Sequence, residues 1–350
     1  MTSTGRDKEP LKHKAISGSN KIRRWPFLFA VAVLFFLLIA YAGVIALRID
    51  RTSAALPGSP AGGTTYLLLG SDERTNIPTA DRDRFGTAAE IPGRRADIIL
   101  VLRVLDDGST KALAVPRDLV VFRKDKGPER LAPMLQEGTG AIADGLCNSL
   151  GIGVDHVVII DFSGLAGLVD LAGGVEVTSD VPLRDDGSGL FIPEGTTRLS
   201  GREALSYVRA RHIESEFVGQ WGPDPIRSSM RSQRAAEVLD GLSKGLALKW
   251  TDPIATHKLL WAVSDAVEVD GGTWPANALQ LRASLENFDR KSLIQIPVKA
   301  SDGPVPIAEL APGAENILRS FNGSGSASSS GSTSSSGSNK ACKNPVLLGG

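Results

Sequence analysis

The chain has 350 residues, of which 42% are hydrophobic, with 39 basic and 39 acidic side chains. This length and apolar content permit one sizeable core or two small ones. The balanced charge says nothing about partners; we expect no nucleic acid among them.

The N-terminus predicts a membrane anchor. Residues 25–47 carry no charged side chain, and this length suits a helix that crosses a bilayer. The flank before it is basic, which is typical of a cytoplasmic end, and it carries Arg6, Lys8, Lys12, Lys14, Lys21, Arg23 and Arg24. We therefore expect a cytoplasmic tail over 1–24, a single-pass helix over 25–47 in the cell membrane, and an extracytoplasmic remainder. A cleaved signal peptide is the alternative, although the run exceeds the usual apolar region.

The remaining chain divides by composition. A stretch rich in Pro, Gly, Ser and Ala predicts a linker over 48–63, and a Ser/Gly-rich segment predicts a flexible tail over 319–350. Between them, residues 64–318 have the length of one α/β domain.

Short aliphatic runs within this body predict strands, as in "TTYLLLG", "DIILVLRVL", "STKALAVP" and "HVVIIDF". Helical patterns alternate with them, including "FSGLAGLVDLAGG", "SGREALSYVRAR" and the long "RSSMRSQRAAEVLDGLSKGLAL". We expect a mixed α/β fold in which helices flank a central mixed sheet.

Charged side chains stand at the ends of the first three predicted strands: Asp72 and Arg74 after the first, Arg95 and Asp97 at the start of the second, Arg117 and Asp118 after the third. If the second strand runs antiparallel to its neighbours, all three groups meet at one end of the sheet. We therefore predict a shared site there.

Further arginines follow in the helical segments. Arg209 and Arg211 are two residues apart, and Arg227, Arg231 and Arg234 have the spacing of one helix face. Such a face is often merely solvated, but clustered guanidinium groups also suit phosphate oxygens. Carboxylates among them, Asp72 and Asp97, suggest a hard divalent cation such as Mg²⁺, or Mn²⁺ in its place.

Two cysteines, Cys147 and Cys342, are the only thiols. In an oxidising compartment they permit one disulfide between body and tail. The alternative is a buried Cys147 and a free thiol in the tail.

Taken in order, these motifs resemble the LytR-CpsA-Psr family of cell-wall enzymes from about residue 64 to 296. The resemblance implies transfer of a glycan from a polyprenyl-pyrophosphate carrier to peptidoglycan or a glycosylated surface protein, with Mg²⁺ on the pyrophosphate. It places Asp72 and Asp97 near the metal. It implies pyrophosphate contacts for Arg95, Arg117, Arg209 and Arg211.

Other positions complete the predicted site. Substrate binding is expected from Arg74, Asp118, Arg231, Gln233 and Arg234, although Asp118 could instead hold Arg117 in place. The late helix departs from the family pattern, because Ala235 follows Arg234 where a glutamine is usual.

The expected reaction is phosphoryl transfer, in which an acceptor hydroxyl attacks the sugar-bearing phosphate and an aspartate of the cluster serves as general base. Neither a P-loop nor a nucleophile elbow is present to suggest other chemistry. Two alternatives stay open: hydrolysis at the same site, and a non-catalytic module that binds anionic wall polymer.

Overall fold

The structure is a computed structural model that describes residues 25–59, 62–74, 82, 86–87, 89–90, 92–123, 126–246, 252–286, 288, 292–301, 307–322 and 342. The predicted basic tail, 1–24, therefore lies outside the described residues. Of the predicted C-terminal tail, only residues 319–322 and Cys342 are described.

Helix α1 (Trp25–Arg48) contains the apolar run predicted as the anchor. Its segment Phe27–Arg48 has a mean hydropathy of 2.8 and is long and apolar enough to cross a membrane. The chain divides into two compact units after Val44, so the last residues of α1 belong to the body.

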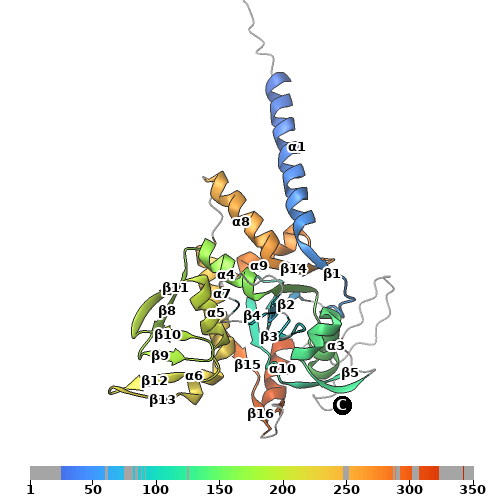
Figure 1. Ribbon diagram of the computed structural model, residues 1–350. Coiled ribbons are helices and arrows are strands. Elements are labelled where there is room, and N and C mark those ends of the chain that lie inside the picture. Colours follow the sequence, from blue (N-terminus) through green and yellow to red (C-terminus); the bar gives the residue numbers. More distant parts are fainter. Residues whose placement is uncertain are drawn as a thin grey trace, which may run out of the picture. The chain divides into compact units, whose positions relative to one another are not determined.

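The body contains a central mixed sheet, which confirms the expected fold class (Figure 1). Its seven strands follow the order β1 (Asp50–Thr52), β14 (Val267–Asp270), β7 (His156–Ile160), β2 (Thr64–Ser71), β3 (Ala96–Val104), β4 (Thr110–Ala114) and β15 (Ile294–Gln295). Strand β3 runs antiparallel to both β2 and β4, while β2 and β7 are parallel. The end of β2, the start of β3 and the end of β4 therefore share one end of the sheet.

The same end of the sheet receives the chain as it leaves α1. The pairing places Asp50, Glu268, Ile159, Leu69 and Ile99 in one row across five strands. Strand β1 thus begins at the end where β2 finishes, although it lies at the far edge of the sheet.

Strand β1 corrects the predicted linker. Residues 48–63 were expected to be a spacer, yet β1 lies among them and pairs with β14. Leu56 packs against the core, and the backbone N–H of Ser59 donates to Asp155 at 2.9 Å. Backbone pairing with a sequence-distant strand leaves no composition signal, which is why this segment reads as a linker.

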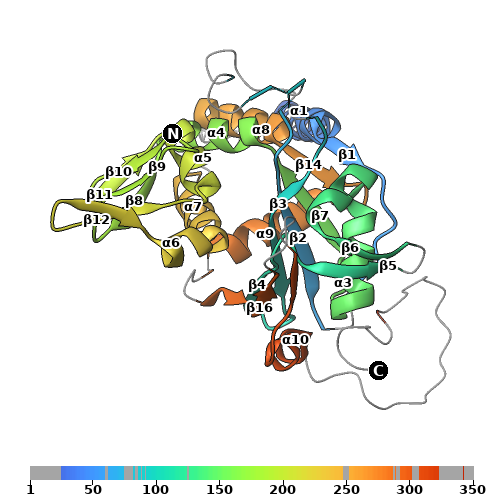
Figure 2. The ribbon, with the colours of Figure 1, turned by 60° about the horizontal axis from the view of Figure 1, so that its bottom comes forward.

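Helices cover both faces of the sheet (Figure 2). Because side chains alternate along a strand, Leu67 and Leu69 point into one core with α3 (Thr139–Leu150), η2 (Ala132–Glu137) and α10 (Ala314–Asn322). On the other face, Tyr66 and Leu102 pack with α9 (Pro275–Glu286). Phe321 is buried, so the body continues past its predicted end at residue 318.

A second core lies beside the sheet, around α4 (Phe162–Leu171), α5 (Gly201–Arg209) and α7 (Arg231–Gly245). Short strands and helices complete this part and the periphery: β5 (Val120–Arg123), β6 (Gly127–Arg130), β8 (Val175–Ser179), β9 (Leu183–Asp185), β10 (Leu190–Ile192), β11 (Gly195–Leu199), β12 (Glu214–Phe217), β13 (Gln220–Pro223), α6 (Pro225–Ser229), α8 (Pro253–Ala266), β16 (Val298–Ala300) and β17 (Ala308–Leu310).

The two cysteines form a disulfide between Cys147 on α3 and Cys342, across a separation of 195 residues. This confirms the first of the two interpretations of the thiols. The bond attaches the distal tail to a helix of the main core.

Candidate functional site

The three strand ends bring their charged side chains together as predicted. The loop after β2 is joined to the start of β3 by two hydrogen bonds: the backbone N–H of Asp72 donates to the carbonyl of Arg95 at 3.0 Å, and the N–H of Arg95 donates to Asp72 Oδ1 at 2.7 Å. Arg117 follows β4 at the same end. The sheet thus supplies a rigid support for these groups.

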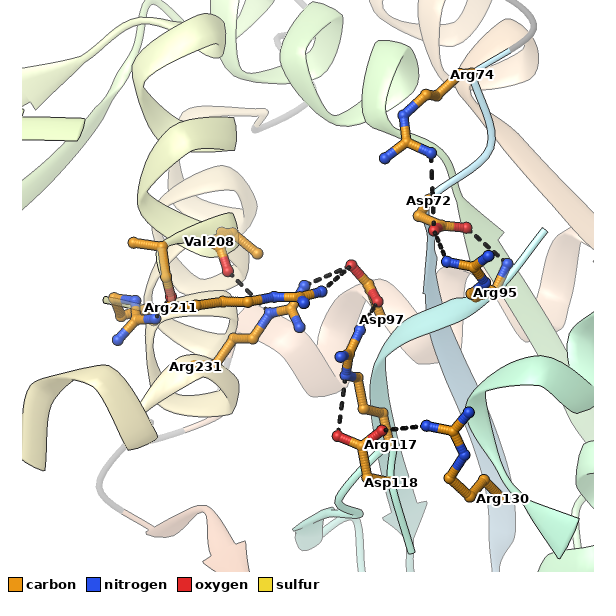
Figure 3. Close-up of polar contacts among 12 residues, drawn as sticks. Asp72, Arg74, Arg95, Asp97, Arg117, Asp118, Arg130, Val208, Arg211 and Arg231 are labelled. Carbon is orange, nitrogen blue, oxygen red and sulfur yellow. Dashed lines mark hydrogen bonds and ion pairs between the residues drawn. The ribbon is translucent and has the colours of Figure 1, made fainter. Parts of the chain in front are cut away.

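Asp97 is the centre of the cluster. Its side chain is only 7% exposed, and it accepts hydrogen bonds from Arg117 and, at 2.6 Å, from Arg231. A third guanidinium, that of Arg211, lies 3.7 Å away. In Figure 3, Arg211 and Arg231 approach Asp97 from one side and Arg117 approaches from the other.

Asp72 forms a second acidic position nearby. The guanidinium groups of Arg74 and Arg95 each lie 3.9 Å from its Oδ2 atom (Figure 3). Arg74 also lies over the ring of Phe162, at 5.7 Å from the ring centroid, and Arg209 lies over the same ring at 4.8 Å. One aromatic ring therefore contacts two cations of the site.

Local structure around α5 positions its two arginines. Ser200 and Glu203 form a capping box that fixes where α5 begins, and the helix ends at Arg209. After α5 the chain passes beside Asp185 of β9. The Asp185 carboxylate accepts hydrogen bonds from the backbone N–H groups of Arg211 and His212, at 2.6 and 3.0 Å. This acceptor fixes the backbone that carries Arg211.

The predicted continuous arginine helix is wrong, because the chain breaks at Met230 between α6 and α7. Asp224 caps α6 and also pairs with the Arg227 side chain at 2.6 Å. Arg227 pairs in addition with Asp180, so its guanidinium is engaged away from Asp97. The break at Met230 stops the i, i+4, i+7 spacing from forming a single face.

Arg234, predicted to bind substrate, is 4% exposed and donates to three backbone carbonyls, those of Tyr207, Ala210 and Arg227. These bonds fix the C-terminal end of α5 and the break between α6 and α7. Arg234 therefore acts through the backbone that carries Arg209 and Arg211. Gln233 is half-buried on the same helix, and its role stays a prediction.

Asp118 holds Arg117, as the structural interpretation expected. Its carboxylate lies 3.3 Å from Arg117 Nε and 3.5 Å from Arg130 Nη1 (Figure 3). Arg130, at the end of β6, was not among the predicted residues. Arg130 pairs with Val120 across the β5–β6 hairpin, and this pairing brings its side chain to Asp118.

The balance of charge in the cluster is cationic. Burial raises the pKa of Asp72, and the nearby charge of Asp97 raises it further. Burial also opposes ionisation of Asp97, but Arg231 and Arg117 outweigh it and hold the pKa of Asp97 below its usual range. Burial lowers the pKa of Arg209 to about 10, and the charge of Arg74 adds to this effect. An anion between these arginines would relieve their mutual repulsion.

The donor set suits a hard cation only in part. Asp72 Oδ2 lies beyond hydrogen-bond distance from the two guanidinium groups beside it, so it retains capacity for a metal ligand. Asp97 has both oxygens in bonds to arginines. Among the described residues there is no group of three or more His, Cys, Asp or Glu side chains that could hold a metal. Mg²⁺ here would need phosphate oxygens and water as further ligands, which is its usual habit.

Sequence reasoning also missed Phe162. It lies two residues after the end of β7, which is parallel to β2, and the ends of parallel neighbours lie at the same edge of a sheet. The aromatic residue immediately after "HVVIID" could therefore have been predicted to lie near the site, because Asp72 follows the end of the neighbouring parallel strand, β2.

Comparison with known proteins places this geometry in context. Residues 46–303 match the LytR_cpsA_psr family model. The chain is 35% identical over 191 residues to the probable cell wall biosynthesis protein LcpB of Corynebacterium glutamicum, covering 51% of this chain and 43% of that protein. It is 30% identical over 210 residues to the polyisoprenyl-teichoic acid–peptidoglycan teichoic acid transferase TagU of Enterococcus faecalis, covering 59% and 61%. The chain thus spans about half the length of these curated relatives.

A solved structure shares the fold. The LytR-Csp2A-Psr enzyme from Actinomyces oris aligns with a TM-score of 0.62 and 28% identity, over 79% of this chain and 96% of that one.

Proposed function

Because this chain belongs to the LytR_cpsA_psr family, we propose that it is a membrane-anchored transferase that attaches a glycan to the cell surface. The donor would be a polyprenyl-pyrophosphate-linked glycan, and the acceptor peptidoglycan or a surface protein. The observation that carries this proposal is the convergence of six arginines on two buried carboxylates at one end of the sheet, namely Arg74, Arg95, Arg117, Arg209, Arg211 and Arg231. Planar guanidinium forks suit a pyrophosphate.

We infer that the N-terminus is cytoplasmic and that the body is extracytoplasmic. The uncharged helix and its basic flank support this orientation. The sheet register adds a geometric argument, since the row through Asp50 and Leu69 puts the arginine cluster at the end of the sheet where the chain leaves α1. Four strand spacings of about 4.8 Å separate β1 from β3, so β3 lies roughly 20 Å from β1 across the sheet.

In the proposed reaction, an acceptor hydroxyl oxygen forms a bond to the sugar-bearing phosphorus, and the bond from that phosphorus to the bridging oxygen breaks. Polyprenyl phosphate leaves with that oxygen and its electron pair. One of the two carboxylates accepts the hydroxyl proton. Arg117, Arg211 and Arg231 hold the oxygens whose charge increases, at positions fixed by Asp97 before the substrate binds.

Asp72 is the residue best placed to hold Mg²⁺ or Mn²⁺, with Asp97 beside it. When bound, such an ion supplies charge neutralisation at the phosphate oxygens. Arg74 and Arg209, fixed on the Phe162 ring, would orient the second phosphate of the donor.

The test is turnover of a short-chain polyprenyl-pyrophosphate glycan by the purified full-length protein with peptidoglycan fragments, with Mg²⁺ or with a chelator. We expect metal-dependent release of polyprenyl phosphate together with acceptor-linked glycan, and loss of both in Arg117→Ala and Asp97→Asn. A matched control is Arg198→Ala, because Arg198 pairs with Glu176 on the exposed face of the two-stranded sheet of β8 and β11.

Two outcomes would contradict transfer. Release without acceptor-linked glycan would indicate hydrolysis. Tight binding without release, in the presence of acceptor, would indicate a module that only binds anionic polymer.

A further inference from the structure

Helix α8 presents an exposed face with apolar and cationic side chains, and the carboxylate of Asp265 on the same side pairs with Arg48. We call this the outer face of α8, made of Ile254, His257, Lys258 and Trp261, whose spacing of three, four and seven residues puts them on one side. All four are exposed, and Ile254 is 69% exposed. An exposed isoleucine and tryptophan on one helix face suggest a contact surface.

The opposite side of α8 is fixed to the body. Ala262, Val263 and Ala266 pack against the second core. The contact with α4 is close at Gly164, where a Cβ atom would lie 2.5 Å from the Ala266 carbonyl oxygen. The outer face therefore has a defined direction relative to the sheet and the arginine cluster.

The outer face lies next to the point where the chain leaves the apolar span. That span ends at Arg48, whose guanidinium lies 3.8 Å over the Trp261 ring and pairs with Asp265, also on α8. Only Ile49 separates Arg48 from β1, and β1 pairs with β14, which directly follows α8. With Cα atoms 3.8 Å apart, β1 begins within about 8 Å of the end of the span. These contacts all lie within the body, so they hold whatever the tilt of the span.

The chemistry of this face matches a lipid surface. Tryptophan is enriched at membrane–water interfaces, and lysine is attracted to anionic headgroups. Isoleucine adds apolar area for the acyl boundary.

We propose that the outer face of α8 binds the surface of the membrane that α1 spans, with Trp261 and Ile254 among the lipids and Lys258 at their phosphates. The proposal rests on the anchor included in the proposed function, but not on the transfer reaction. Contact at α8 would turn the arginine end of the sheet toward the bilayer, because α4, against which α8 packs, begins at Phe162.

The test is quenching of tryptophan fluorescence in the full-length protein, reconstituted in phosphatidylcholine–phosphatidylglycerol vesicles whose acyl chains carry bromine. Trp261→Phe is compared with Trp274→Phe, a control in which the lost tryptophan is 71% exposed but lies beyond the far end of β14. We expect the lipid-quenched part of the emission to fall in Trp261→Phe and to stay unchanged in Trp274→Phe.

A second variant keeps the tryptophan and cannot disturb the core. Lys258→Glu should reduce quenching of Trp261 in vesicles with phosphatidylglycerol and much less in pure phosphatidylcholine. Flotation of each variant with the vesicles reports the anchor separately.

The results are distinguishable. Protein that floats with the vesicles but whose Trp261 emission is not quenched would overturn the proposal while leaving the anchor intact. Protein that does not float would overturn the anchor, and the α8 contact with it.

Discussion

Replacing Asp97 with asparagine removes the one charge that three guanidinium groups share. The asparagine side chain would keep nearly the same volume and one acceptor oxygen, but Arg211 and Arg231 would lose the carboxylate beside them, and Arg117 would keep only Asp118. Because the Asp97 side chain is 7% exposed, water cannot replace the lost carboxylate effectively.

Removing one partner of a buried ion pair lowers the free energy of unfolding by about 3–5 kcal/mol. Because asparagine keeps one acceptor oxygen, we expect a loss near the lower limit for Asp97→Asn, about 3 kcal/mol. For a domain of this size, that corresponds to a fall in Tm of roughly 6–10 °C. Differential scanning fluorimetry of the detergent-solubilised full chain measures it. The matched control is Asp118→Asn. The Asp118 side chain is 25% exposed, so this change should lower the free energy of unfolding by about 1 kcal/mol or less.

Inorganic pyrophosphate should restore part of the lost Tm in Asp97→Asn and stabilise it more than the wild-type protein, because the anion takes the place of the carboxylate. If Asp97→Asn lowers Tm no more than Asp118→Asn does, Asp97 is not the centre of charge that we describe. Equal stabilisation of mutant and wild type by pyrophosphate would also contradict the reasoning.

Three further predictions follow from the contacts. In Arg234→Lys the planar fork that binds three carbonyls is lost, so the free energy of unfolding should fall by about 2–3 kcal/mol. Calorimetry should also show weaker pyrophosphate binding. Unchanged binding would show that Arg234 does not position the site. Burial opposes ionisation of Asp270, but hydrogen bonds from groups including Thr273 lower its pKa to about 2. Its charge therefore stabilises the fold above the unfolded pKa of about 4, and this stabilisation is lost as pH falls toward 2. Urea titrations should show that Asp270→Asn lowers the free energy of unfolding by about 2 kcal/mol at pH 7, and that the two proteins become equally stable near pH 2. A difference in stability that does not change with pH would contradict this role of the Asp270 charge. Cys147→Ser should lower the free energy of unfolding by about 5 kcal/mol in the chain-entropy model, matching reduced wild-type protein; a midpoint equal to that of the oxidised protein would rule this out.

Local patterns in the sequence were enough to predict several features. The uncharged run before Arg48, the aliphatic runs that became β2, β3, β4 and β7, and the helical pattern that became α5 depend on neighbouring residues alone. The charged strand ends were also visible, since a carboxylate such as Asp97 beside a buried strand has few structural reasons to be there.

Tertiary structure decided the rest. Only strand pairing established that β3 is antiparallel to both neighbours, which brings Asp72, Asp97 and Arg117 to one end. Backbone hydrogen bonds across a sheet carry no signature in either strand, so β1 reads as linker although it pairs with β14.

The arginines of the late helix show the same limit. Their spacing is identical in a continuous helix and in the broken one, yet the cap at Asp224 directs Arg227 away while Arg231 reaches Asp97. Arg234 is held by carbonyls that lie more than twenty residues earlier as well as by that of Arg227. Sequence spacing specifies which residues can share a face, whereas the partners that compete for each guanidinium are assembled only when distant segments pack together.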